Sequence, residues 1–181
     1  NEKEIVHRDK IFENYLKNGT KVITSSKVAK NHLIKSYKYL NIEKINVLNF
    51  VPLIRTSKIK KFSVIKKKYN LPLNYFFCPN QFWVHKNHKL IINAVNHIKN
   101  KKINFKIIFS GSRRDYRNHS HILSMMTKIK KNNLSNYFIF LDKITYEDVI
   151  SIMYYSNAII NPSVFEGWST TVEEGKLLKK I

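Results

Sequence analysis

The sequence predicts an α/β protein built on a parallel sheet with helices on both faces. Short apolar runs alternate with longer helical patterns along most of the 181 residues. Runs such as 107–109 (Ile-Ile-Phe) are apolar throughout, as is typical of strands covered on both faces. Parallel neighbours need crossover connections, which are almost always right-handed. Because ligands of such sheets bind beyond the carboxyl ends of the strands, we expect functional residues in the loops that follow them.

The composition indicates a globular protein with a strongly basic surface. Its 43% hydrophobic residues suffice for a sizeable core. A formal net charge of +21 raises two alternatives, nucleic-acid binding and attraction to an anionic membrane surface. Only five cations are arginines, whose planar donors suit nucleic acids better than lysine does. We therefore expect a solvated lysine-rich surface and no nucleic-acid partner, while a peripheral contact with the inner face of the membrane stays open.

Cysteine usage and hydropathy suggest a cellular compartment. Cys78 is the only cysteine, which excludes a disulfide framework, and its apolar surroundings predict a small buried side chain. No apolar run approaches transmembrane length, and residues 1–10 lack the form of a signal peptide. We expect a cytoplasmic protein.

The first part of the chain alternates two helices with two strands. They are expected at residues 1–18 (helix), 21–24 (strand), 25–40 (helix) and 45–50 (strand). Ser25 and Ser26 offer N-caps for the second helix. A lysine-dominated segment, 53–71, follows and is expected to be a linker with a short basic helix.

The remainder repeats one strand–loop–helix unit four times. The strands are expected at 75–78, 105–109, 137–141 and 158–161, and the helices at 88–99, 119–131, 145–156 and from about 169 to the last residue. Asp148 stands at the capping-box position of the third helix, which Thr145 caps. The intervening loops, which must meet at one edge of the sheet, are 79–87, 110–118, 142–145 and 161–169.

The last unit carries the most informative motif, at residues 159–176. An apolar strand, an Asn161-Pro162 turn, a loop and a helix beginning near Ser169 together form an anion site, because the first N–H groups of a helix lack internal partners. Two carboxylates, Glu166 and Glu174, flank it. A nucleotide sugar, with a sugar, a diphosphate and a ribose, has the matching layout. The alternative is a plain βα unit in which both glutamates are solvated.

Residues 165–169 (Phe-Glu-Gly-Trp-Ser), followed by Glu174, resemble the E-x7-E signature of retaining family 4 glycosyltransferases of the GT-B fold. The resemblance implies a Rossmann-like sheet, with Glu166 as a catalytic residue on sugar hydroxyls and Glu174 on ribose hydroxyls of the donor. It also implies a phosphate held after Gly167 by the amides of Trp168, Ser169 and Thr170. Gly175-Lys176 departs from the small apolar pair that is usual in this family.

The loop at 79–87 resembles the family's phosphate-binding loop, which carries an arginine and, five positions later, a lysine. Lys86 matches the lysine, and a cation there can neutralise the leaving diphosphate. Gln81 stands in place of the arginine and brings no charge, so phosphate affinity should be weaker. His85 and His88 have no third ligand nearby, so we expect no metal there.

The next two loops carry weaker signals. Gly111 lets the backbone approach a ligand closely, as a glycine after a strand does in this family. Arg113 and Arg114 could meet the donor or the acceptor, although a solvated pair is at least as plausible. Asp142 occupies a position where relatives often have glycine, so base specificity does not carry over.

The resemblance as a whole implies part of a hexosyltransferase-type enzyme of polysaccharide biosynthesis that uses a nucleotide-diphosphate sugar without metal or other cofactor. The acceptor would be a glycan or a lipid-linked glycan. Residues 1–52 would end an N-terminal, acceptor-side domain, 53–71 would be the linker, and 72–181 would be an incomplete donor-binding domain. A chain truncated at both ends is expected to be inactive alone. Two alternatives remain: a non-catalytic nucleotide-binding module of the same fold and a basic nucleic-acid-binding protein.

Overall fold

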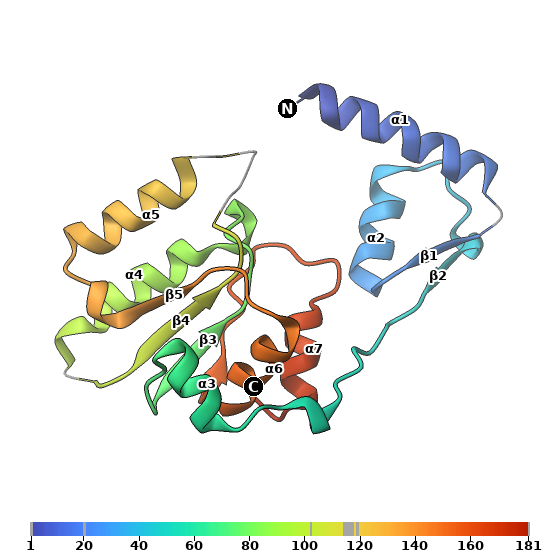
Figure 1. The fold of residues 1–181 in the computed structure, drawn as a ribbon. Helices are drawn as coiled ribbons and strands as arrows, with labels where there is room; N and C mark the ends of the chain where they lie inside the picture. Colours follow the sequence, from blue (N-terminus) through green and yellow to red (C-terminus); the bar gives the residue numbers. More distant parts are fainter. Residues whose placement is uncertain (1, 20, 102, 114–117, 119, 181) are drawn as a thin grey trace. The chain divides into compact units, whose positions relative to one another are not determined.

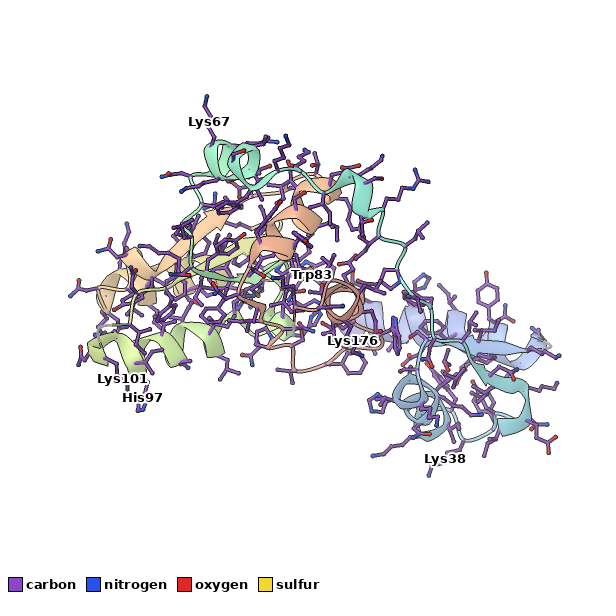
Figure 2. All side chains as sticks on the ribbon, turned by 90° about the horizontal axis from the view of Figure 1, so that it is seen from below. Lys38, Lys67, Trp83, His97, Lys101 and Lys176 are labelled. Carbon is purple, nitrogen blue, oxygen red and sulfur yellow. The ribbon has the colours of Figure 1, made fainter. Side chains whose placement is uncertain are left out.

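The computed structural model describes residues 2–19, 21–101, 103–113, 118 and 120–180 (Figure 1). The chain divides into two compact units, 1–51 and 52–181. The segment expected as a linker, 53–71, belongs to the second unit. Lysines such as Lys38, Lys67 and Lys101 are exposed and point away from the ribbon (Figure 2).

The first unit contains two parallel strands and two α-helices. Its elements are α1 (Glu2–Asn18), β1 (Val22–Thr24), α2 (Lys27–Ser36), a 3-10 turn (Ile42–Lys44) and β2 (Ile45–Val47). Strands β1 and β2 pair directly, with Ile23 opposite Asn46. The predicted cap is confirmed, because the Ser26 hydroxyl accepts a hydrogen bond from the Ala29 amide at 3.0 Å.

The second helix is shorter than the sequence predicts. We expected it to reach residue 40, but it ends at Ser36, where Tyr37 adopts φ −125° and ψ 80°. The Tyr37 hydroxyl donates to Asp9 of α1 at 3.0 Å. A local helical pattern in the sequence cannot predict this contact between residues 28 positions apart, which lies where the helix ends early.

The second unit contains a four-stranded parallel sheet, as predicted. Its strands are β3 (Tyr75–Cys78), β4 (Lys106–Ser110), β5 (Phe138–Leu141) and β6 (Ala158–Ile159), in the order β5-β4-β3-β6. Helices α4 (His88–Ile98) and α5 (Ser120–Lys131) pack on one face through a core that includes Phe109 and Met125. The other core, which includes Phe77 and Ile152, joins the sheet to α3 (Phe62–Tyr69) and α6 (Tyr146–Tyr155).

The strand order places a switch point between β3 and β6. The chain runs outward from β3 through β4 to β5, and α6 then returns it to the opposite side of β3. The loops after β3 and β6 therefore leave neighbouring strands in opposite directions and open a crevice at the carboxyl edge. The predicted site loops, 79–87 and 161–169, are those two loops.

The last helix, α7 (Thr170–Leu177), ends sooner than expected. We predicted a helix that continues to the last residue, but Lys179 is left-handed, with φ 55°. The amides of Lys179 and Lys180 donate to the carbonyls of Lys176 and Gly175, which is the Schellman pattern of a helix end. Gly175 also lets α7 lie close to β6, since a Cβ there would be 2.4 Å from the Ile159 side chain.

Asp148 has a different role from the predicted capping-box acid. Its buried carboxylate accepts hydrogen bonds from Lys60 at 2.5 Å, Lys68 at 2.7 Å and the Tyr69 hydroxyl at 2.6 Å. Burial alone would raise the pKa of Asp148, but these bonds outweigh it and lower the pKa below its ordinary value. The residue ties α6 to the basic segment around α3. Thr145 does cap α6, accepting a bond from the Asp148 amide at 3.3 Å.

Candidate functional site

The two loops of the switch point are fastened to each other. The Val164 amide donates to the His85 carbonyl at 2.9 Å, and the Asn87 side chain donates to the Pro162 carbonyl at 3.2 Å. Asn87 has φ 54° and joins a short 3-10 turn to α4. An asparagine suits this position because it tolerates left-handed backbone. The loops thus hold each other in place beside the crevice.

Lys86 and Glu166, the two residues predicted to be catalytic, form an ion pair across these loops. Lys86 Nζ lies 2.6 Å from Glu166 Oε1, and the side chains are only 15% and 25% exposed. Burial alone would raise the pKa of Glu166, but hydrogen bonds from Lys86 and Ser163 hold it below its ordinary value. Glu166 is therefore a paired, ionised carboxylate, in contrast to the solvated loop residue of the alternative interpretation.

A set of short polar side chains fixes the start of α7. The Asn161 oxygen accepts from the Asn80 amide group at 3.1 Å and from the Ser163 hydroxyl at 2.9 Å. The Asn161 amide group donates to the Ser169 hydroxyl at 2.9 Å, and that hydroxyl caps the helix by accepting from the Val172 amide. The helix dipole is thereby aimed at the carboxyl edge of the sheet.

The loop after β4 packs backbone to backbone on the loop after β3. Gly111 has φ 138°, and a Cβ there would lie 2.6 Å from the Asn80 carbonyl oxygen, so only glycine fits. The predicted close approach is real, but the partner is the neighbouring loop. Gln81 supports the same contact, because its side-chain oxygen accepts from the Ser112 amide at 2.7 Å. That oxygen is occupied, so the side-chain NH2 is the group that Gln81 can offer to a ligand.

Arg113 and Asp142 bridge the second and third loops. Two guanidinium nitrogens of Arg113 each lie 2.6 Å from an oxygen of Asp142. The hydrogen bonds from Arg113 lower the pKa of Asp142. Asp142 therefore links the third loop to the second through its side chain. Arg114 lies outside the described residues.

Glu174 is buried, which contradicts the alternative of an exposed helix face. It is 8% exposed, and its Oε1 accepts a hydrogen bond from the Tyr146 hydroxyl at 2.8 Å. Burial raises the pKa of Glu174, and the Tyr146 bond offsets only part of that rise. Sequence reasoning missed Tyr146. The available signal was its place directly after the Thr145 cap, at the start of the helix that follows the third loop.

A cavity of about 500 Å³ lies at the carboxyl edge of the sheet. Its lining comes from the ends of the strands and the first three loops, from α6 and from the first turn of α7: Pro79, Asn80, Gln81, Trp83, Lys86, Ser110, Gly111, Lys143, Ile144, Tyr146, Val149, Thr170 and Thr171. Four predicted residues, namely Gln81, Lys86, Gly111 and Thr170, contribute directly. The other five do not line the cavity: Glu166 pairs with Lys86, Gly167 and Trp168 form the bend before α7, Ser169 caps this helix, and Glu174 accepts a hydrogen bond from Tyr146.

Several apolar and titratable groups serve packing. Cys78 is fully buried, as predicted, and burial raises the pKa of its thiol to about 12. The His88 ring stacks on Phe82 with centroids 4.5 Å apart, and burial lowers its pKa to about 4. Within the described part of the chain, no three His, Cys, Asp or Glu residues gather as metal ligands would. Nor does any helix described there combine the length and apolarity needed to cross a membrane.

Comparisons with known proteins agree with this geometry. The family described as "Glycosyl transferases group 1" matches residues 57–180. A search of curated proteins found no match. Among solved structures, Anabaena HepE in complex with UDP and glucose matches with a TM-score of 0.77 and 16% identity, over 92% of this chain and 44% of that one.

Two further structures have the same fold. A glycosyltransferase from Rickettsia africae matches with a TM-score of 0.74 and 21% identity, over 93% of this chain and 46% of its own. Sucrose-phosphate synthase from Thermosynechococcus elongatus matches with a TM-score of 0.68 and 13% identity, over 91% of this chain and 40% of its own. The chain thus spans less than half the length of these proteins. Together the family match and the shared GT-B fold establish that this chain belongs to the group 1 glycosyl transferases.

Proposed function

We propose that the protein transfers a hexose from a nucleotide-diphosphate sugar to a glycan or lipid-linked acceptor, with retention of anomeric configuration. The observation that carries this proposal is the arrangement at the switch point. A half-buried lysine, its paired carboxylate and a capped helix N-terminus lie close to one cavity. Several similar structures contain UDP or UDP-glucose, which favours a uridine nucleotide here.

The diphosphate would lie between Lys86 and the first turn of α7. The helix begins at Thr170, so the early amides have no acceptor within it and can donate to phosphate oxygens. We assign that role to the amides of Trp168, Ser169 and Thr170. Lys86 supplies the positive charge, and Gln81 adds a neutral donor in place of a cation. This charge stabilises the leaving nucleotide, so no divalent metal is required in the proposed reaction.

Glu166 would contact hydroxyls of the transferred sugar. In the structure it is satisfied by Lys86, with 2.6 Å between the charged atoms. Donor binding would exchange partners: diphosphate oxygens take Lys86, and sugar hydroxyls take the carboxylate oxygen that Lys86 leaves. Such an exchange leaves Lys86 paired with the diphosphate and Glu166 hydrogen-bonded to hydroxyls, so neither charged group is left without a partner.

Glu174 would bind ribose hydroxyls, one turn along α7 from the phosphate. The acceptor would reach the sugar at the open side of the cavity. A basic surface would favour work at the inner, cytoplasmic face of the membrane on a lipid-linked substrate, because anionic leaflets attract lysine-rich proteins. Polysaccharide biosynthesis is the process that uses such substrates.

The test is a donor and turnover screen on the full-length protein. Saturation-transfer NMR with UDP- and GDP-sugars should select one donor, and incubation with a glycan or lipid-linked acceptor extract should yield a product with the donor's anomeric configuration. Activity should survive EDTA. Donor binding without any transfer would instead support a non-catalytic nucleotide-binding module. An inverted product would refute retention.

A further inference from the structure

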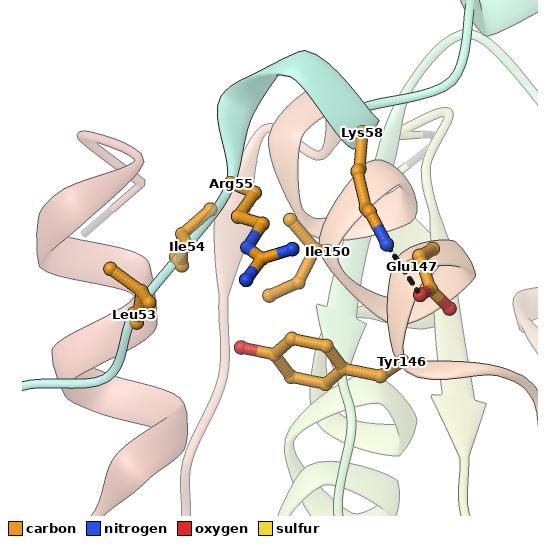
Figure 3. Close-up of a pocket in the computed structure, with 7 residues that line it drawn as sticks. All are labelled: Leu53, Ile54, Arg55, Lys58, Tyr146, Glu147 and Ile150. Carbon is orange, nitrogen blue, oxygen red and sulfur yellow. Dashed lines mark ion pairs between the residues drawn. The ribbon is translucent and has the colours of Figure 1, made fainter.

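Tyr146 stands at the junction of two cavities beside the proposed donor site. It is the first residue of α6 and lines both the cavity of about 500 Å³ described above, here called the main cavity, and a smaller one of about 200 Å³. In the smaller cavity its ring extends from α6, with the hydroxyl at the end remote from the Lys58–Glu147 ion pair (Figure 3). That hydroxyl donates to Glu174 Oε1 at 2.8 Å.

Tyr146 holds the Glu174 carboxylate at one of its two oxygens. The bond to Oε1 is 2.8 Å long, and Glu174 as a residue is 8% exposed. Among the described residues, Oε2 does not count as a buried side-chain atom that lacks a partner. A hydroxyl group on a ligand is a neutral donor that suits the oxygen that Tyr146 leaves.

We propose that Tyr146 is a positioning residue that orients Glu174 toward the ribose, and that it thereby makes the site select ribonucleotides over deoxyribonucleotides. This inference rests on the proposed function, since it needs a nucleotide in the main cavity. Tyr146 holds one carboxylate oxygen in place, so that the other faces the ligand in a fixed direction. Without that bond the carboxylate can rotate, and a ribose hydroxyl loses its preferred partner.

The residue type suits this role. A tyrosine hydroxyl is a neutral donor, and the pKa of Tyr146 is raised to about 12 by partial burial and by the bond to Glu174, so it keeps its proton. A lysine there would neutralise the carboxylate and compete with the ligand. The position of Tyr146 is also fixed, because Thr145 caps the helix immediately before it.

The experiment measures the affinity of the full-length protein for UDP, 2′-deoxy-UDP and 3′-deoxy-UDP by isothermal titration calorimetry. Wild type should prefer UDP over one deoxy analogue by about tenfold, the value of a hydrogen bond to a charged group. Tyr146→Phe should reduce this ratio to about threefold or less, and Glu174→Gln should do the same. The double variant should lose no more of this preference than either single variant, because both substitutions disrupt the same Tyr146–Glu174 interaction.

The control is Tyr154→Phe, on the same helix. Tyr154 is 41% exposed and contacts the Tyr155 ring, so the variant removes a hydroxyl from α6 without touching Glu174. The ratio of its affinities for UDP and the deoxy analogue should equal that of wild type. Tyr146 is itself 49% exposed, so the loss of its hydroxyl should leave the fold intact, as circular dichroism can verify. An unchanged ratio in Tyr146→Phe, or no preference for UDP in wild type, would overturn the inference. If no nucleotide binds wild type at all, the proposed function itself fails.

Discussion

Replacing Lys86 with Met removes the charge of the proposed catalytic pair while keeping most of the side chain's length. The wild-type ion pair spans 2.6 Å, and its side chains are 15% and 25% exposed. Breaking a fully buried pair costs about 3–5 kcal/mol, and residual solvent access lowers that figure here to about 2 kcal/mol. Glu166 would be left half-buried without its cation, so its pKa should rise. In catalysis, loss of a group that stabilises developing charge should cost about 100-fold in kcat.

Two assays separate these effects. Urea unfolding gives the loss of stability, and steady-state kinetics with the donor selected by NMR gives kcat and KM. We expect kcat to fall more than donor affinity, because the lysine charge matters most as the diphosphate leaves. Lys89→Met is the matched control: Lys89 lies three residues further along the same segment and is exposed. This control should change neither the free energy of unfolding nor the kinetic constants kcat and KM.

The charge-swapped variant, Lys86→Glu with Glu166→Lys, gives the sharpest test. It can restore the ion pair and much of the stability, but it places an anion where the diphosphate should bind. We therefore expect recovered stability without recovered transfer. Full turnover by the swapped protein, or unchanged kcat in Lys86→Met, would show that the pair is purely structural.

Three further predictions concern the loops and helices around the site. Gly111→Ala should lower the free energy of unfolding by about 2 kcal/mol or more in urea titrations, because its φ of 138° and the Asn80 carbonyl at 2.6 Å exclude a Cβ. Asp148→Asn should cost about 1–2 kcal/mol at pH 7. The folded-state pKa of Asp148 is lowered, so its contribution to the free energy of unfolding is present above the ordinary pKa of 3.8 and is lost as pH falls through the lower folded value. The melting temperature of the variant should therefore change less with pH in the acid range than that of wild type. The pKa of Glu174 is raised, so UDP affinity should begin to fall at a pH above that of an ordinary glutamate, and Glu174→Gln should flatten this profile in calorimetry.

The fold was predictable because its strands carry local signals. Residues 75–78 are apolar throughout and lie between polar segments, and the strand occupies those residues. The two wrong helix ends have another origin. Tyr37 forms a contact with α1, and Lys179 adopts a left-handed conformation that usually falls to glycine or asparagine. Neither event leaves a trace in helical periodicity.

The residues of the candidate site could be named from the sequence only where a motif marked them. The E-x7-E pattern pointed to Glu166 and Glu174, and the loop context pointed to Lys86. The partners of these residues were not predictable, since they come from distant segments: Tyr146 is 28 residues from Glu174 in the sequence. Asp148 shows the same limit, because its local position suggests a cap while its carboxylate binds side chains about 80 residues away.

The opposite environments of the two glutamates fit the two roles proposed for them. Glu166 has a cationic partner and a lowered pKa, so it is charged before donor arrives and can release Lys86 to the diphosphate. Glu174 has a neutral partner and a raised pKa, so its carboxylate has a neutral hydrogen-bond donor and a ribose hydroxyl would add another of the same kind. The first residue is thus suited to an exchange of partners during reaction, and the second to recognition of hydroxyls that do not react. If their roles were reversed, Glu174→Gln would impair kcat and Glu166→Gln would impair only nucleotide affinity. Kinetic and calorimetric measurements on the two variants therefore decide which carboxylate faces the sugar.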